Sequence, residues 1–499
     1  MAQEKSGYRI DMVNGPLAGK LLLFALPLML SSVLQLLFNA ADVVVVGRFA
    51  GSEALAAVGS TTSLINLLIT LFVGFSVGTN VVVARDLGAG RGDDVRRAVH
   101  TSITLAASSG VVLLIAGVLL CRKMLELMSS PDDVIGLATL YLRIYFCGMP
   151  ANMLYNFGSA ILRAQGDTRR PLYFLGVAGV VNVVLNLIFV IVFHMSVAGV
   201  ALATIISQYI SAALVLRCLM QDKGPLRVEL RALCLDLRVV RRILQVGLPA
   251  GFQGIVFSIS NVVIQSSINS FGSTVIAGAA ASNNIEGFVY AGMTACYQTA
   301  LTFTSQNYGA GKTKRVNRIM GLCLLYSTII GVVLGGLAVR FGSTLAAIYA
   351  PGQPEVIAQA VVRLQVICTT YFLCGLMDTQ VGVLRGIGYS MLPMIASLVG
   401  ACGLRLLWIA TVFQVWHTPT MPRQLDHHRR VPLRLLPAGA QAGLRQDGRH
   451  GEHPADQLIS KNERRPRPAP EAQTGGFQLV KKPRRVRRPQ AANRVKSFS

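Results

Sequence analysis

The stretch from Gly15 to Arg48 constrains this chain most, because about thirty of its residues are apolar or small. At 1.5 Å rise per residue, such a helix crosses a bilayer. It nevertheless carries one carboxylate, Asp42, and an acid at mid-bilayer costs roughly 2.5–3.5 kcal/mol on insertion scales. The acid either faces a bundle interior or aqueous cavity, or lies near the interface and reaches water. We favour the first, because Asn39 and Gln35 lie one and two turns before Asp42 and form a polar stripe with it.

Many further segments have the same character. Of the 499 residues, 52% are hydrophobic and only 14% are charged, which is too apolar for soluble domains. Apolar segments of spanning length follow at roughly 53–84, 94–121, 134–162, 171–194, 197–219, 242–270, 274–305, 316–339, 356–384 and 391–416. We therefore expect an all-α polytopic membrane protein with eleven spans.

Lys and Arg concentrate in four loops, which follow the second, fourth, sixth and eighth spans. Short cytoplasmic loops carry the excess of basic residues, so these four loops should share the cytoplasmic side. The N-terminus is then cytoplasmic too. We expect a multi-pass protein of the cell (inner) membrane.

The two halves of the chain repeat each other. Loop motifs recur in the same order at an offset of 221 or 222 residues: Leu26-Pro27 at Leu248-Pro249, Gly51-Ser52 at Gly272-Ser273, Gly88-Ala89-Gly90 at Gly309-Ala310-Gly311, and Leu162-Arg163 with Gly166 and Pro171 at Leu384-Arg385 with Gly388 and Pro393. Because each copy contributes an even number of spans, the halves should be related by an axis along the membrane normal. The fold class is thus two pseudo-symmetric six-helix lobes.

The repeat demands a twelfth helix that the sequence does not supply. The sixth span maps onto residues 418–440, which hold five charged residues and several prolines and cannot cross a bilayer. From Trp416 to Ser499 there are 18 Lys plus Arg against 6 Asp plus Glu. The net charge of this tail is therefore +12, half of the total formal charge of +24. We interpret this tail as the product of a shifted reading frame near residue 418. The alternative is a genuine disordered tail that binds anionic lipid or nucleic acid.

Four regions follow from these observations. Residues 1–220 form an N-terminal lobe with six spans, and 242–416 form a C-terminal lobe with five. Between them, residues 221–241 form a cytoplasmic amphipathic connector, whose apolar residues alternate with Arg and Glu as in a helix lying on a membrane surface. Residues 417–499 are the basic tail, rich in Pro and Arg.

The sequence offers nothing that suggests an enzyme. It lacks the phosphate-binding GxxxxGK[ST] signature, HExxH, paired CxxC motifs and a nucleophile elbow. The nine cysteines have no metal-ligand spacing. We expect no cofactor and no resident metal.

From about residue 15 to 416, the chain resembles the multidrug and toxic compound extrusion (MATE) family of transporters, of the bacterial type. The resemblance rests on Asn39-Ala-Ala-Asp42 with Gly47-Arg48, on Ala54-Leu-Ala-Ala-Val-Gly59, on Gly88-Ala-Gly90, on Leu162-Arg163-Ala-Gln-Gly166-Asp167, and on their echoes in the second half. It implies two six-helix lobes around a central cavity. It also implies secondary active antiport by alternating access, in which amphiphilic or cationic small molecules leave in exchange for H⁺ or Na⁺.

The resemblance also implies a coupling site in the first lobe, at Asp42, Asn39, Asn182 and Asn186. Asp42 matches the first-helix acid of the family, and Na⁺ is an alternative to H⁺ at Asp42 and Asn182. Many members have Asn and Asp where this chain has Asn182 and Asn186, so one titratable group is missing here. A single acid can still couple transport if a proton and a cationic substrate compete for it in states open to opposite sides.

The second lobe offers two further acids, Glu286 and Asp378, as a possible ion site. Asp378 corresponds to Asn156 in the first lobe. Either acid can instead be satisfied by hydrogen bonds or by an Arg such as Arg385 or Arg405. We favour Glu286 slightly, because its segment otherwise reads as apolar enough to span.

A substrate pathway should be lined by residues such as Gln35, Phe38, Asn156, Tyr209 and Tyr290, since aromatic faces hold flat cations. Aromatic residues more often simply pack helices, and we rank packing first for any one of them.

Two other functions stay open. A lipid-linked saccharide flippase needs a more cationic cavity, and Asp42 has no intramembrane Arg cluster near it, which argues against this function. A non-transporting incomplete bundle with a polyanion-binding tail is the other. We expect a monomer whose partners are small amphiphilic or cationic molecules and membrane lipids, with no specific nucleic acid, and little or no transport while the twelfth helix is missing.

Overall fold

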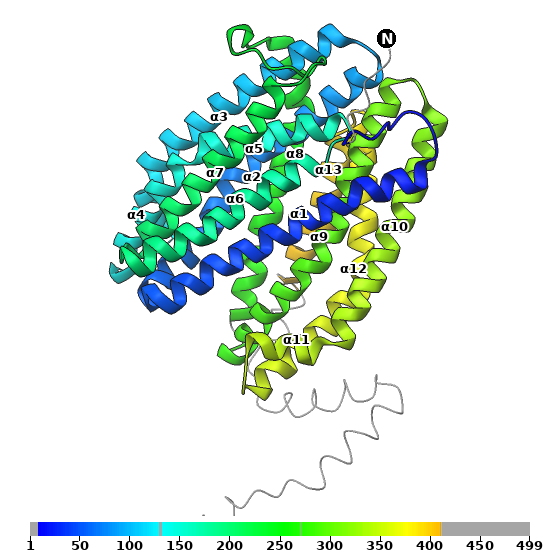
Figure 1. The fold of residues 1–499 in the computed structure, drawn as a ribbon. Helices are drawn as coiled ribbons and strands as arrows, with labels where there is room; N and C mark the ends of the chain where they lie inside the picture. Colours follow the sequence, from blue (N-terminus) through cyan, green and yellow to red (C-terminus); the bar gives the residue numbers. More distant parts are fainter. Residues whose placement is uncertain (1–7, 129–131, 270, 410, 412–499) are drawn as a thin grey trace, which may run out of the picture. The chain divides into compact units, whose positions relative to one another are not determined.

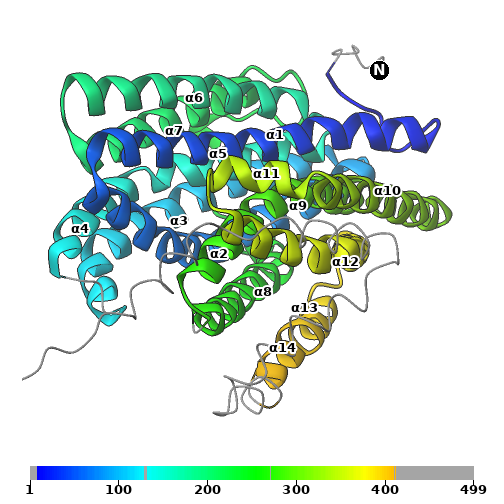
Figure 2. The same cartoon turned by 90° about the horizontal axis from the view of Figure 1, so that it is seen from below.

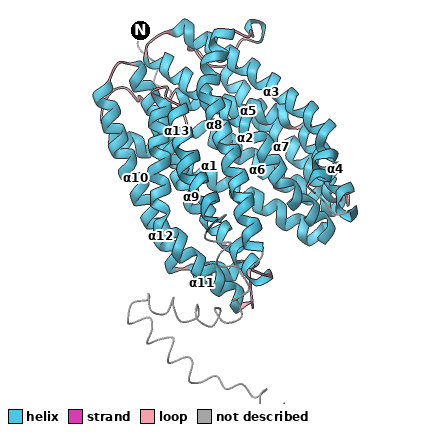
Figure 3. Ribbon diagram, turned by 180° about the vertical axis from the view of Figure 1, so that it is seen from behind, coloured by secondary structure: helices cyan, strands magenta, loops and turns pink. Residues whose placement is uncertain are grey.

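The computed structural model describes residues 8–128, 132–269, 271–409 and 411, and their regular structure is entirely helical (Figure 1, Figure 3). The α-helices are α1 (Leu17–Val45), α2 (Ser52–Gly88), α3 (Gly92–Leu127), α4 (Asp132–Cys147), α5 (Met149–Ala164), α6 (Arg169–Leu187), α7 (Ser196–Met220), α8 (Leu237–Asn269), α9 (Ser273–Gly309), α10 (Thr313–Arg340), α11 (Gly342–Tyr349), α12 (Pro354–Gly386), α13 (Met391–Ser397) and α14 (Leu404–Trp408). The region 418–440, for which we expect no twelfth helix, lies outside the described residues.

Eight of the described helices are long and apolar enough to cross a membrane, and the bent pair α4 and α5 makes a ninth span. The all-α polytopic fold is therefore confirmed. The pair bends by 47° between Cys147 and Met149, where one straight span over 134–162 was expected. Pro150 lies in the first turn of α5, where it lacks an N–H to donate and its ring clashes with the preceding turn, so the helix breaks there.

Helix α9 departs from the expected span at 274–305. With 37 residues it is long enough to cross a membrane, but it is not among the helices that are also apolar enough to do so. Of its polar residues, Glu286, Thr302 and Asn307 are buried, whereas Asn283 is exposed. α9 therefore buries much of its polar surface against the helices around it. The last expected span, 391–416, is described only as a shorter apolar helix, Met391–Leu407.

The prediction of an amphipathic helix in the connector is wrong for residues 221–236. This segment is irregular apart from one 3₁₀ turn, Leu230–Ala232, and α8 begins at Leu237. Gly224 and Pro225 stop helix propagation. The segment is instead fixed to the first half of the chain: Leu226 and Val228 are buried, and the Glu229 N–H donates to His100 Nε2 at 3.1 Å.

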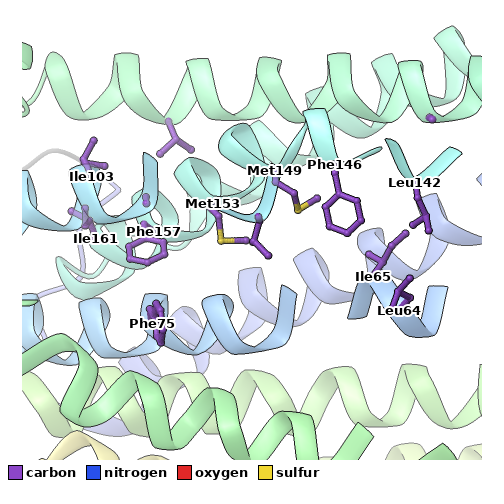
Figure 4. Packing of buried hydrophobic residues seen from close by; sticks show 14 of the residues in the cluster. Leu64, Ile65, Phe75, Ile103, Leu142, Phe146, Met149, Met153, Phe157 and Ile161 are labelled. Atoms are coloured by element: carbon purple, nitrogen blue, oxygen red, sulfur yellow. The ribbon is translucent and has the colours of Figure 1, made fainter. Parts of the chain in front are cut away.

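The core of the first half is built mainly from α2, α3, α4, α5 and α7. Figure 4 shows Phe146 and Met149 on either side of the bend between α4 and α5, followed along α5 by Met153 and Phe157. All four side chains are fully buried. The bend is therefore part of a packed interior.

The first helix of each half packs on the second helix of the other half. α1 runs alongside α6 and also packs on α9, where Phe24 and Phe303 meet edge to face with ring centroids 5.3 Å apart (Figure 2). α8 packs on α2 so closely that a Cβ at Gly74 would lie 2.4 Å from the Gly251 backbone nitrogen. Small residues permit this close approach of two helices. The two halves are thus joined by crossed helix pairs.

The repeat is visible in one reciprocal contact. A Cβ on Gly88 would lie 1.9 Å from the Gln306 carbonyl oxygen, and a Cβ on Gly309 would lie 2.0 Å from the Arg85 carbonyl oxygen. The offset of 221 relates Gly88 to Gly309 and Arg85 to Gln306. The two halves therefore touch backbone to backbone through equivalent residues, as two copies related by an approximate twofold axis would.

The N-terminal segment, residues 8–16, connects both halves at this same end. The Ile10 N–H donates to the Gly166 carbonyl at 3.2 Å in the first half. Asn307 of the second half donates to the Met12 carbonyl at 3.0 Å, and the Met12 side chain is buried. The basic loops predicted to share one side of the membrane thus gather with the N-terminal segment at one end of the helices.

Candidate functional site

Asp42 lies in a polar chain that three helices build in the first half. The Asn186 amide on α6 donates to Asp42 Oδ1 on α1 at 2.5 Å and to Asn182 Oδ1 at 3.3 Å. Asn182 in turn donates to Thr204 Oγ1 on α7 at 3.4 Å. Asn182 and Asn186 are four residues apart, so they share one face of α6. The structure therefore brings together three of the four residues expected at the coupling site, and adds Thr204.

Helices α1 and α6 each change from α-helical to π-helical geometry directly after their polar residues. A π-helical turn, Val46–Ala50, follows Asp42 on α1, and a second one, Ile188–Val192, follows Asn186 on α6. Such turns are rare and frequently lie at functional sites. The two π-helical turns therefore make α1 and α6 irregular directly next to Asp42 and Asn186.

The chain of polar groups is rich in oxygen acceptors. Asn186 is fully buried, and its Oδ1 has no hydrogen-bond partner among the described residues. Together with the carboxylate of Asp42 and the Asn182 and Thr204 oxygens, it forms a donor set suited to a hard cation. No group of three His, Cys, Asp or Glu residues that could hold a metal ion occurs in the described part of the chain.

The other expected residues of α1 do not join this cluster. Gln35 and Asn39 are exposed on the helix surface. Phe38 packs so tightly against Gly179 of α6 that a Cβ on this glycine would lie 1.8 Å from its ring. Phe38 thus holds α1 against α6 and positions Asp42 opposite Asn186.

Two of the expected pathway residues are engaged locally. The Asn156 amide donates to the Asn152 carbonyl, one turn earlier on α5, at 2.9 Å. The Tyr209 hydroxyl donates to the Cys147 carbonyl at 3.1 Å, at the bend between α4 and α5. Tyr209 thus ties α7 to the broken helix.

In the second half, Glu286 is satisfied within the protein. It accepts from the Ser282 hydroxyl at 2.6 Å and forms an ion pair at 3.4 Å with Arg363 of α12. Arg363 also donates to the Ala279 carbonyl at 3.1 Å. A buried carboxylate and a partly exposed guanidinium thus join α9 to α12.

Replacing Glu286 by Gln is expected to destabilise the protein by about 1.5–3 kcal/mol, because it takes the charged partner from Arg363, which is itself only partly buried. Thermal unfolding in detergent measures the effect. Glu126→Gln, which breaks an exposed pair with Arg122 on α3, is the matched control and should cost at most about 1 kcal/mol. Equal unfolding temperatures for the two variants would contradict a structural role of Glu286.

Asp378 and Tyr290 line a cavity of about 570 Å³ between α8, α9, α12 and α14. Its wall also contains Arg385 and Arg405. The expected lack of an intramembrane Arg cluster concerns Asp42, and these two Arg residues line a cavity in the second half.

Sequence reasoning missed Thr204, Arg363 as the partner of Glu286, and the joint position of Arg385 and Arg405. Thr204 lies in an apolar helix, α7, and a single hydroxyl in such a helix has no spacing pattern that marks it as part of a site. Arg363 is 77 positions from Glu286, so no local spacing connects them. The repeat gave one signal that Arg385 has a role in the fold, because the equivalent position in the first half is also an arginine, Arg163.

The comparisons with known proteins point to one family. The profile of the MatE family matches residues 27–188 and 249–410, one stretch in each half. "Probable multidrug resistance protein YoeA" of Bacillus subtilis is 28% identical over 391 residues, which cover 77% of this chain and 84% of that protein. "Multidrug export protein MepA" of Staphylococcus aureus is 20% identical over 397 residues, which cover 79% of this chain and 88% of that protein.

A solved structure agrees in fold. The one described as "Outward-facing conformation of a multidrug resistance MATE family transporter of the MOP superfamily" superposes with a TM-score of 0.75 at 21% identity, over 80% of this chain and 90% of that one. Since the profile matches well over half of the chain and both of its halves, the chain belongs to the MatE family, whose members are multi-pass membrane transporters and not enzymes.

Proposed function

We propose that the two lobes of this chain are those of a secondary active antiporter for multidrug efflux, which exports amphiphilic, often cationic small molecules in exchange for H⁺ or Na⁺ when a twelfth helix completes the second lobe. The observation that carries the proposal is the hydrogen bond between Asp42 and Asn186, extended through Asn182 to Thr204. The printed names of the relatives YoeA and MepA, which refer to multidrug resistance and multidrug export, support the substrate class.

In the proposed mechanism, Asp42 is the coupling group. Its carboxylate binds either the coupling ion or the positive group of a substrate. Asn186 orients the carboxylate, and the oxygens of Asn182, Asn186 and Thr204 supply further ligands when the ion is Na⁺. Because one carboxylate serves both cations, they compete, and exchange follows when the two occupied forms open to opposite sides.

The arrangement in the membrane belongs to the same proposal. Residues 1–220 and 242–416 act as two lobes that rock against each other, which the reciprocal contact of Gly88 and Gly309 supports. The end that gathers the basic loops and residues 8–16 faces the cytoplasm, in keeping with the positive-inside tendency. The inner membrane of the cell is the proposed location, and the monomer is the proposed working unit.

The coupling ion is tested in proteoliposomes. Addition of a cationic dye substrate should produce a substrate-dependent pH change if H⁺ is exchanged, or a Na⁺-dependent dye flux without that pH change if Na⁺ is exchanged. The measurement compares this chain with a version in which an apolar helix of about twenty residues replaces the sequence after Trp416. Only the second version is expected to transport. Dye flux that is independent of both ions would contradict the antiport mechanism.

One observation favours a second candidate, a lipid-linked saccharide flippase. The cavity that contains Arg385 and Arg405 has the positive charge that a pyrophosphate-bearing lipid requires. Translocation of such a lipid across a vesicle bilayer, without any dye export, would favour this alternative.

A further inference from the structure

The cavity of about 570 Å³ in the second half is separate from the site at Asp42. Its wall comes from α8, α9, α12, Ala401 and α14, whereas the Asp42 cluster belongs to α1, α6 and α7. The charged side chains in its wall are Asp378, Arg385 and Arg405, so the formal charge of the wall is +1.

Arg385 is buried without a carboxylate partner. Its side chain is held by two neutral acceptors, the Tyr297 hydroxyl at 2.8 Å and Gln253 Oε1 at 2.7 Å. The residue is only 6% exposed, its Nε has no hydrogen-bond partner, and no ion pair joins it to a carboxylate of the described residues. The Asp378 carboxylate in the same wall attracts Arg385 electrostatically but does not bond to it directly, so an anion brought by a ligand can still be stabilised here.

The remaining wall suits a flat ring. Tyr290 and Tyr371 have ring centroids 6.2 Å apart and planes inclined by 37°, and Phe257 and Tyr297 add two more aromatic side chains. Aromatic side chains stack on flat ligands, while guanidinium groups bind carboxylate, sulfonate or phosphate oxygens in pairs. The cavity therefore combines apolar, flat contact area with two anion-binding groups.

The repeat separates what the two halves share from what is special to the second. Arg385 has a charged equivalent, Arg163, whereas the equivalents of Asp378 and Arg405 in the first half are Asn156 and Val183, which carry no charge. Conversely, Asp42 falls opposite Val263 or Ile264, and Asn182 opposite Leu404. Each half thus has polar groups where the other is neutral or apolar, and in the second half Arg385 and Arg405 lie on one cavity together with Asp378.

We propose that this second-half cavity binds aromatic anions, with Arg385 and Arg405 on the anionic group and the tyrosines on the ring. Asp378, two turns before Arg385 on α12, opposes a second negative charge and accepts an amine at the other end of a zwitterion. Binding of the anion does not depend on the proposed transport function. Its consequence, that the substrate range extends to anionic and zwitterionic aromatic molecules, does rest on that function.

Binding to the purified full-length chain in detergent, measured by titration calorimetry, tests the proposal. The probes are naphthalene-2-sulfonate and 2-naphthylmethylammonium, which share a ring and differ in charge. The sulfonate should bind more tightly. Arg405→Gln should weaken sulfonate binding by about tenfold, because a charged hydrogen bond is lost, and Asp378→Asn should strengthen it several-fold.

Arg340→Gln is the matched control. It removes the same charge from an exposed position on α10, outside the cavity wall, and should leave sulfonate binding unchanged. Arg385→Gln also disturbs the bonds to Tyr297 and Gln253, so its thermal unfolding is compared first. Equal affinity for the two probes, or unchanged sulfonate binding in both Arg405→Gln and Asp378→Asn, would overturn the proposal. Such a result leaves the coupling role of Asp42 untouched, because binding in detergent requires no ion gradient.

Discussion

Replacement of Asp42 by Asn is expected to reduce ion-coupled export of a cationic dye to the level of empty vesicles. The amide has nearly the same shape and can still accept from Asn186, so the bond between α1 and α6 is kept. It cannot carry a negative charge, however. A cation at this position loses a charged partner worth about 1.5–3 kcal/mol, and its affinity falls by about tenfold or more.

The variant is measured in the version that carries an apolar twelfth helix, in the same proteoliposome assay. Asp93→Asn makes the same chemical change at an exposed position in the first turn of α3, and it should export as the unmodified protein does. Asp42→Glu, which keeps the charge, should retain part of the activity. Export by Asp42→Asn at the unmodified rate would remove Asp42 from the mechanism.

Replacement of Gly88 by Ala is expected to destabilise the protein by about 3 kcal/mol or to prevent its accumulation in the membrane. The new methyl group would lie 1.9 Å from the Gln306 carbonyl oxygen and 2.8 Å from its carbon. These atoms belong to the backbone of α9, which cannot give way as a flexible side chain can. The two helices must therefore separate, and overpacking of this kind typically costs about 1–3 kcal/mol or more.

Gly59→Ala is the control, because it places the same methyl group on the same helix with no atom within 4 Å. It should be neutral or slightly stabilising. Gly309→Ala should reproduce the Gly88→Ala defect, since its methyl group would lie 2.0 Å from the Arg85 carbonyl oxygen. Unfolding temperatures in detergent compare all three. A defect in only one of the two equivalent glycine variants would contradict the reciprocal contact.

The core of the candidate coupling site could be predicted from the sequence. Asp42 stands out because an acid is costly in an apolar segment, and this signal is local, so it requires no knowledge of the fold. Asn182 and Asn186 are implied by the resemblance to the MATE family, and their spacing places both amides on one helix face. Thr204 gave no such signal, because a threonine hydroxyl can bond to its own helix, as its hydroxyl does to the Val200 carbonyl at 2.9 Å.

The environment of the second-half acids could not be predicted. Glu286 was favoured as an ion-binding residue because its segment read as apolar, but the structure gives it Arg363 as a partner from a distant helix. The same limit applies to the connector. Its alternating apolar residues suggested a surface helix, whereas Leu226 and Val228 are buried against the first half. In both cases the decisive contacts are distant in sequence.

The internal repeat carried the prediction of the fold further than hydropathy did. Hydropathy did not reveal that α9 carries buried polar residues such as Glu286 and Asn307, or that the segment over 134–162 bends by 47°. Matched glycines such as Gly88 and Gly309 indicated two related halves, and the structure places them at equivalent contacts. How the halves cross, with α1 on α9 and α8 on α2, has no signature in the sequence.

Met12 and the residues next to it connect the N-terminal segment to both halves of the helical bundle. Its side chain is 1% exposed, and its carbonyl accepts from Asn307, while Ile10 two residues earlier is bonded to Gly166 in the opposite half. Any tilt that parts the halves at this end must extract that side chain or release one of these bonds, and uncovering a methionine costs about 1.5–3 kcal/mol. Residues 8–12 therefore link the two halves at this end, and in the proposed transport cycle each opening at this end requires their detachment.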